Sequence, residues 1–184
     1  MYPWFRFFVA MYKAKSAPPL QISETCITPL RVGWSDSDLF GEMNNGRHLT
    51  LFDIGRFVFS VRTGLWKAVK RNGWGFVVAG SSVRYRKRLH PGQRFEQHTS
   101  VIAYDDKWFY FLQTHQRGEV WHAAALIRAA VVSKGKLVST QEVLSTMGQT
   151  AWQPTMPEWI QAWIEADKLR PWPETHSGLA QSEV

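Results

Sequence analysis

Three carboxylates fall within seven residues of one polar segment, WSDSDLFGEMNNG, at Asp36, Asp38 and Glu42. A mostly apolar segment follows directly and predicts a buried helix, so these side chains are expected near the N-terminus of that helix. A helix N-terminus carries partial positive charge and free N–H groups. A carboxylate there can stay ionised while the amides bind a developing oxyanion. This combination is the minimum apparatus for acyl transfer.

Two other roles for these carboxylates stay open at this point. Asp36 or Asp38 could cap the helix or brace the loop, as Asp often does at helix starts. A metal site of the D-x-D type is the second alternative, but the sequence contains no matching cluster of metal ligands elsewhere.

The elements that must position this segment are predicted from hydrophobic periodicity. Residues 26–34 predict a strand, 47–63 a helix that is apolar on most of its circumference, and 65–71 a short helix that ends at Asn72-Gly73. Alternating patterns then predict strands over 74–89, 94–104, 108–116 and 120–133. A long helix that is apolar on nearly all sides needs a curved sheet around it. The predicted fold class is therefore α+β, with an antiparallel sheet wrapped around one long central helix.

The two termini predict elements outside this domain of residues 23–150. Residues 1–22 form an N-terminal arm with the pattern of an amphipathic helix that lies on a membrane surface or packs on a partner subunit. Its proposed apolar face comprises Trp4, Phe5, Phe8, Met11 and Tyr12. A capping box from Thr155 to Glu158 predicts an extra helix at 156–169, within a C-terminal segment of residues 151–173. Residues 174–184 are expected to be disordered.

Composition restricts the class of protein and its partners. The 184 residues carry a formal net charge of +7 and a single cysteine, Cys26, so a disulfide scaffold is excluded and a reducing compartment is favoured. No run approaches the roughly 18 apolar residues that cross a bilayer. Ten basic residues and no acidic one lie between Asp53 and Glu96, which favours an anionic ligand.

Three arginines in this basic stretch suit phosphate groups. Arg84, Arg86 and Arg88 alternate along the strand predicted over 74–89, so they are expected on one face of it. Tyr85 would point to the opposite face. Nucleic-acid binding usually interleaves aromatic platforms with the charge, so it is disfavoured here. The alternative is a solvated basic face.

The polar segment and its surroundings carry a family resemblance. WSDSDLFGEMNNGRHLTLFDIGR resembles the D-x-D-x-x-G-H-x-N-N-x-x-Y-L…R signature of the 4-hydroxybenzoyl-CoA-thioesterase-like hotdog family. The resemblance continues through VRYRKRLHPGQRF, AYDDKWFYFLQTH and GEVWHAAALIRAAVV, and it covers residues 28–150. The later PEWIQAWIEADKLR is similar to the helix that follows the domain in the branch that includes thioesterase superfamily member six.

The resemblance implies roles for individual residues. Asp38 matches the catalytic aspartate, which attacks the thioester carbonyl or activates water against it. Gly41 matches the glycine that lets the backbone approach the site. Asn45, one of the paired asparagines, and His48, which stands where the family usually has Tyr, are assigned to substrate binding.

One position departs from the family pattern. The histidine that follows the family glycine is Glu42 here. A second carboxylate near Asp38 could raise the pKa of one of the two, or replace Asp38 as the base. The change could equally mark a relative that has lost activity.

The resemblance implies an acyl-CoA thioesterase that releases a free acid and coenzyme A through an Asp carboxylate. It also implies a cytoplasmic homodimer or homotetramer with sites between subunits, and no metal, nucleic acid or cofactor beyond the coenzyme A of the substrate. The first alternative is a non-catalytic hotdog protein that binds acyl-CoA or lipid, held at the inner face of a membrane through residues 4–15. A hotdog dehydratase is the second alternative.

Overall fold

A computed structural model describes residues 2–171 and divides them into two compact units that meet between Pro154 and Thr155. Residues 174–184, for which disorder is expected, lie outside the described part. The first unit comprises α1 (Trp4–Ser16), β1 (Cys26–Arg31), the 3₁₀ helix η1 (Trp34–Asp36), α2 (Asn45–Arg62), α3 (Leu65–Asn72), β2 (Gly75–Tyr85), β3 (Arg94–Tyr104), β4 (Phe109–Arg117), β5 (Val120–Ser133), β6 (Lys136–Val138) and α4 (Thr140–Met147). The second contains α5 (Glu158–Leu169).

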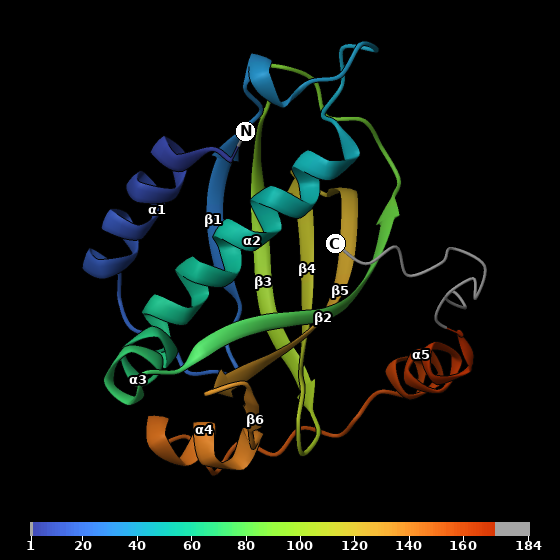
Figure 1. Cartoon of the computed structure of the whole chain (residues 1–184). Coiled ribbons are helices and arrows are strands. Elements are labelled where there is room, and N and C mark those ends of the chain that lie inside the picture. Colours follow the sequence, from blue (N-terminus) through green and yellow to red (C-terminus); the bar gives the residue numbers. More distant parts are fainter. Residues whose placement is uncertain (1, 172–184) are drawn as a thin grey trace, which may run out of the picture. The chain divides into compact units, whose positions relative to one another are not determined.

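The described strands form one antiparallel sheet that curls around α2 (Figure 1). The strand order is β1-β3-β4-β5-β2, with β6 paired to β5. The predicted α+β fold, a curved antiparallel sheet around one long central helix, is confirmed. The predicted bounds of β3 and β5 match those observed.

The central helix α2 is apolar where it faces the sheet. Leu51, Phe52, Ile54 and Phe59 are fully buried. Gly55 lets the helix approach the sheet closely, because a Cβ atom there would lie 1.6 Å from Nε2 of Gln97 on β3. The approach brings the polar side chains of β3 and β4 directly under the helix.

The N-terminal helix α1 is part of the first unit and packs on α2 of the same chain. The ring of Phe7 meets Phe57 edge-on at 5.2 Å, and the Tyr2 hydroxyl donates to Asp53 Oδ2 at 2.9 Å. This side of the helix is therefore covered within the same chain. The opposite side is exposed and carries Trp4, Phe5, Phe8 and Tyr12, whereas Met11 is half-buried.

The predicted arginine row on one strand is wrong. Strand β2 ends at Tyr85, so only Arg84 lies on it, and Arg86 and Arg88 belong to the following loop. The imidazole of His122 explains this ending. Its Nδ1 lies 3.2 Å and 2.9 Å from the carbonyl oxygens of residues 87 and 88, and its own carbonyl accepts the N–H of Arg86 at 2.8 Å, so the chain leaves the regular ladder while it stays bound to His122.

The end of β1 and the elements after β5 also differ from the prediction. Strand β1 ends at Arg31 rather than residue 34, because Asp36 Oδ2 accepts the N–H of Gly33 at 2.7 Å and closes a 3₁₀ turn. Strand β6 and helix α4 were not predicted. Within residues 2–171 we find no helix with both the length and the apolarity needed to cross a bilayer.

Helix α5 begins later than the capping box predicted. Pro157, not Thr155, is the N-cap, and no side chain caps this helix. The physical reason is proline itself, which drives the residue before it out of the helical region, so a helix containing residue 156 is disfavoured.

Candidate functional site

The loop before α2 is a tight hairpin. The N–H of Asp38 donates to the Glu42 carbonyl at 2.9 Å, and residues 37 and 43 form an isolated bridge. Gly41 adopts a φ of +70°, which the turn requires and which side chains disfavour. Leu39 and Phe40 form the tip and are almost fully exposed.

Asp36 is a structural anchor at the base of this hairpin. Its side chain is 1% exposed. Oδ2 lies 2.5 Å from Arg6 Nη1 on α1, and Oδ1 lies 3.1 Å from Arg47 Nε on α2. The bracing role left open for this carboxylate is therefore the one the structure gives it.

Asp38 lies closer to the tip of the hairpin than Asp36 and is half-buried. Oδ1 accepts the N–H of Phe40 at 2.8 Å, a local turn bond. Among the described residues no Lys or Arg pairs with this carboxylate, so its second oxygen is available to a substrate or a water molecule.

Glu42 forms an ion pair instead of meeting Asp38. Its Oε2 lies 2.7 Å from Arg88 Nε. Beside it, the carbonyl oxygen of Gly41 accepts a hydrogen bond from His90 Nδ1 at 3.0 Å. These two contacts fasten the 86–90 loop to the hairpin, so Gly41, Glu42 and Arg88 are brought together while Arg84 and Arg86 are exposed.

The first turn of α2 leaves one amide available. Asn44 is the N-cap, and its Oδ1 accepts the N–H of Gly46 at 2.9 Å. The N–H of Asn45 donates to no acceptor in the described residues, and its carbonyl accepts from the Tyr85 hydroxyl at 3.2 Å. With the partial positive charge of the helix end, this amide can stabilise a developing oxyanion.

A buried histidine pair lies beneath this turn. Nδ1 of His48 is 2.8 Å from Nδ1 of His115 on β4, and His115 Nε2 is 3.0 Å from Gln97 Oε1. Burial, and secondly the nearby charge of His122, lowers the pKa of His48 to about 4. Burial likewise holds the pKa of His115 well below its usual value. Both rings are therefore neutral near pH 7.

The contacts of the pair assign the proton on each ring. Gln97 Oε1 accepts, so His115 carries its proton on Nε2 and accepts at Nδ1. The proton between the rings then belongs to His48 Nδ1, which leaves Nε2 of His48 as a hydrogen-bond acceptor. We find no partner for this nitrogen within residues 2–171.

A cationic pocket of about 460 Å³ adjoins the 86–90 loop. Lys87, Arg88 and Arg117 contribute positive charge, and His90 and His122 also line it. Arg88 is the one predicted phosphate contact that lines this pocket.

Sequence reasoning missed His115, Gln97 and His122. The signal is nonetheless present, since Gln97 and His115 occupy inward positions in strands that otherwise bury apolar residues such as Phe95 and Phe111. Polar side chains at such positions need partners, and so they indicate a buried network. Within residues 2–171, no three His, Cys, Asp or Glu side chains gather as a metal site requires.

Comparison with known proteins decides the family. The model of the thioesterase-like superfamily matches residues 32–164. The chain belongs to this superfamily. The match begins just before the hairpin and includes α2 and every strand from β2 to β6, so the site described above lies within the family domain.

Relatives in the superfamily agree with this assignment. Protein THEM6 of Drosophila melanogaster is 34% identical over 137 residues, which is 73% of this chain and 69% of that protein. The probable thioesterase YbaW of Escherichia coli shares the fold with a TM-score of 0.62 at 17% identity, covering 68% of this chain and 98% of YbaW. SAV2348 of Staphylococcus aureus, solved in complex with CoA, has a TM-score of 0.62 at 16% identity, covering 84% and 93%. YbaW and SAV2348 are thus similar to this chain in fold.

Proposed function

We propose that this protein hydrolyses an acyl-CoA thioester to a free acid and coenzyme A, with Asp38 as the reacting carboxylate. The observation that carries the proposal is the difference in pairing among the three carboxylates of the hairpin. Asp36 is occupied by two arginines and Glu42 by one, whereas Asp38 has a free carboxylate oxygen in the loop that leads into α2. Membership of the thioesterase-like superfamily supports the reaction class.

The proposed chemistry needs a nucleophile and an oxyanion site. Asp38 either attacks the thioester carbonyl, giving a mixed anhydride that water then hydrolyses, or removes a proton from the water that attacks the carbonyl. In both routes the C–S bond breaks, water supplies the oxygen of the free acid, and a proton from that water goes to the thiolate. The negative charge that develops on the carbonyl oxygen is stabilised by the Asn45 N–H at the positive end of α2. Nε2 of His48 is the proposed acceptor for a substrate N–H or a water molecule.

The phosphates of coenzyme A are proposed to lie at the 86–90 loop. Arg84, Arg86 and Arg88 stay the proposed contacts, reached from the end of β2 and the loop after it rather than from one strand. Arg88 lines the cationic pocket, and guanidinium groups bind phosphate with paired hydrogen bonds. The S. aureus neighbour that was solved with CoA is consistent with a ligand of this class.

We further propose that the protein is a cytoplasmic homodimer or homotetramer. Strand β2 is an eleven-residue edge strand, and edges of that length invite pairing with another chain. The exposed Leu39 and Phe40 at the hairpin tip offer apolar surface that a second copy would cover. Sedimentation equilibrium of the full chain tests this, and a monomer at micromolar concentration would contradict it.

A specific observation favours the second candidate, a non-catalytic binder at a membrane surface. Four aromatic side chains of α1 face solvent, with Lys13 and Lys15 beside them, as on helices that lie in an anionic membrane surface. Because α1 also packs on α2, deleting it would damage the fold. The better test is Trp4→Ser with Phe8→Ser, which should weaken binding to anionic vesicles, against Trp121→Ser as a control. Equal binding by all forms would exclude the membrane contact.

The experiment that tests the catalytic proposal is Asp38→Asn. We expect hydrolysis of the best acyl-CoA substrate to fall at least about a hundredfold, because the base or nucleophile is lost while the shape is kept. Near-wild-type turnover would remove Asp38 from the reaction. Glu42→Gln is the companion variant, and a smaller loss is expected because Glu42 is paired with Arg88.

A further inference from the structure

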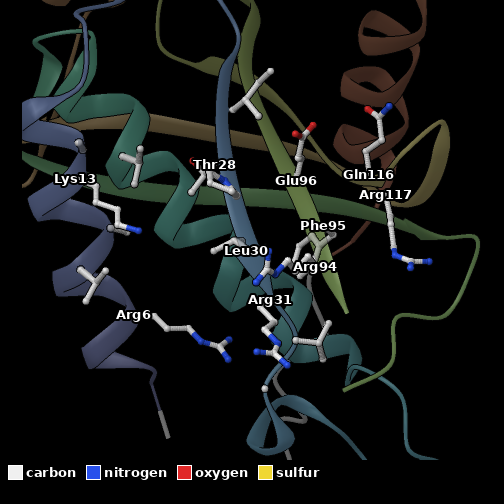
Figure 2. A pocket seen from close by; sticks show the side chains of 18 of the residues that line it. Arg6, Lys13, Thr28, Leu30, Arg31, Arg94, Phe95, Glu96, Gln116 and Arg117 are labelled. Carbon is white, nitrogen blue, oxygen red and sulfur yellow. The ribbon is translucent and has the colours of Figure 1, made fainter. Parts of the chain in front are cut away.

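A groove of about 1090 Å³ lies between α1 and the edge strand β1, and none of Asp38, Gly41 and Glu42 lines it (Figure 2). The apolar part of its lining includes Val9 and Ala10 on α1, Leu30 on β1, Val32 just after β1, Val58 on α2 and Phe95 on β3. Val32 and Val58 are buried, so they form a floor rather than a rim. The groove is therefore an apolar channel distinct from the hairpin, and it shares one lining residue, Arg117, with the cationic pocket.

One end of the groove carries three hydrogen-bond donors from three elements: Lys13 on α1, Thr28 on β1 and Arg62 on α2. Thr28 is 8% exposed, and its hydroxyl has no hydrogen-bond partner. The thiol of Cys26, a weak hydrogen-bonding group, is a polar neighbour. A buried hydroxyl without a good partner is costly, and an acceptor brought by a ligand would satisfy it.

Within residues 2–171, no carboxylate pairs with the charges of Lys13 and Arg62. Arg62 donates through Nε to the Pro18 carbonyl at 3.1 Å and through Nη1 to Cys26 Sγ at 3.6 Å. Lys13 forms no ion pair in the described residues, and Figure 2 shows it reaching from α1 toward β1, where Thr28 lies. An anionic group placed between them would meet two cations and one hydroxyl donor.

The other end of the groove is open, and its one cation on α1, Arg6, is neutralised by the pair with Asp36. Phe5 and Trp34 line it and are more than four-fifths exposed. The distance along α1 from Lys13 to Phe5 is about 12 Å, at 1.5 Å per residue. The groove thus has a cationic head end and an apolar tail end, separated by about the length of a medium alkyl chain.

The edge strand argues against a peptide as the occupant. Pro29 lies in the middle of β1 and has no N–H, so an added strand could not form a continuous ladder along this edge. Besides Arg6, which is paired with Asp36, three further cations line the groove: Arg31, Arg94 and Arg117. Glu96 is the one carboxylate among the lining residues, so the surroundings favour an anion.

We propose that this groove binds a single-chain lipid with an anionic head group. The head, a carboxylate or a phosphate, accepts hydrogen bonds from Lys13, Thr28 and Arg62. The alkyl chain lies along the apolar channel toward Phe5 and Trp34. This site goes beyond the proposed thioesterase site and does not depend on it.

Calorimetry on the full-length, delipidated protein tests the site with three probes that share one chain: dodecanoate, dodecyl phosphate and 1-dodecanol. We expect the anionic probes to bind at least about tenfold more tightly than the neutral alcohol, since charge-assisted hydrogen bonds are the strong ones. The tighter of the two anions identifies the head group. Equal affinity for the alcohol and the anions would overturn the proposal.

Matched variants locate the binding. Lys13→Gln and Thr28→Val should each weaken dodecanoate binding several-fold to tenfold, whereas Lys15→Gln on the same helix, outside the groove, should not. Thr28→Val conserves shape, and an unchanged melting temperature excludes misfolding as the cause. Methyl resonances of Leu30 and Val32 should shift on titration. If Lys13→Gln and Lys15→Gln have the same effect, or these methyls do not shift, the groove is not the site.

Discussion

Asp36 and Asp38 lie two residues apart in the same hairpin and have opposite environments. Asp36 is buried and neutralised by Arg6 and Arg47, one from each of two helices. Asp38 is half-buried and bonded only to the backbone of its own turn. The two residues are of the same type and lie in the same hairpin. Their burial and their ion-pair partners therefore decide which carboxylate stabilises the fold and which is free to react.

Removing the charge of Asp36 should have the largest effect on stability. Asp36→Asn leaves two partly buried arginines without their anion, and we expect the free energy of unfolding to fall by about 3–5 kcal/mol. Asp38→Asn should change it by no more than about 0.5 kcal/mol, as for an ordinary surface site. Urea unfolding of the two variants measures the contrast. Similar losses in both would show that the two carboxylates do not divide their roles.

The buried histidine layer under the hairpin predicts acid sensitivity. His48 has a pKa of about 4 in the folded protein against 6.5 in an unfolded chain. As the pH falls below about 6.5, His48 binds a proton in the unfolded chain but not in the folded protein. The free energy of unfolding therefore decreases until the pH falls below the pKa of His48 in the folded protein. The expected loss between pH 7 and pH 4 is about 3 kcal/mol.

Urea midpoints across this pH range measure that loss. The variant His48→Gln should flatten the dependence, and His98→Gln, which changes a half-exposed histidine, should not. An unchanged slope in His48→Gln would mean that the histidine layer does not govern acid stability.

The close approach of α2 to β3 at Gly55 can be tested in the same way, by its effect on stability. Gly55→Ala places a Cβ atom against the Gln97 amide and should cost about 1–3 kcal/mol, as overpacking does. In the double variant with Gln97→Ala the clash with the Gln97 amide disappears and only the contact with Thr99 Oγ1 at 2.8 Å is left, so the combined loss should be smaller than the sum of the two single losses. Simple additivity would show that the close approach carries no strain.

The smallest expected effect concerns substrate phosphates. Arg88→Gln should raise the Michaelis constant for the best acyl-CoA about tenfold with little change in turnover, because the phosphates bind alike in ground and transition states. Lys136→Gln, an exposed cation on β6, is the matched control. A fall in turnover instead of a rise in the Michaelis constant would place Arg88 in the chemistry through its pair with Glu42.

The core elements could be predicted because their periodicity is uninterrupted. The alternation in β3 and β5 gave their bounds, and the nearly all-round apolar surface of α2 indicated a wrapped helix. The short pieces were harder. Helix α4 carries a real capping signature, since Ser139 accepts the N–H of Glu142 at 3.1 Å, yet the same signature at Thr155 is overridden by Pro157. The same capping motif thus marks a helix that was not predicted, α4, and misplaces the start of one that was predicted, α5.

The site was only partly predictable for a related reason. The sequence places Asp36, Asp38 and Glu42 in one loop, but their partners come from distant positions: Arg6 on α1 and Arg88 after β2. Such long-range ion pairs leave no local signal. The predicted arginine row failed in the same way, because the ring that ends β2 belongs to His122 on β5.

Thiol release tests the central claim most directly. The wild-type protein, Asp38→Asn and Asp36→Asn would be assayed with acyl-CoAs of short, medium and long chain and with aryl-CoAs. We expect wild-type turnover on at least one class, a loss of at least about a hundredfold in Asp38→Asn with a wild-type melting temperature, and retained chemistry in whatever fraction of Asp36→Asn is folded. Absence of release from every acyl-CoA by folded wild-type protein would contradict the claim and favour a non-catalytic acyl-CoA binder.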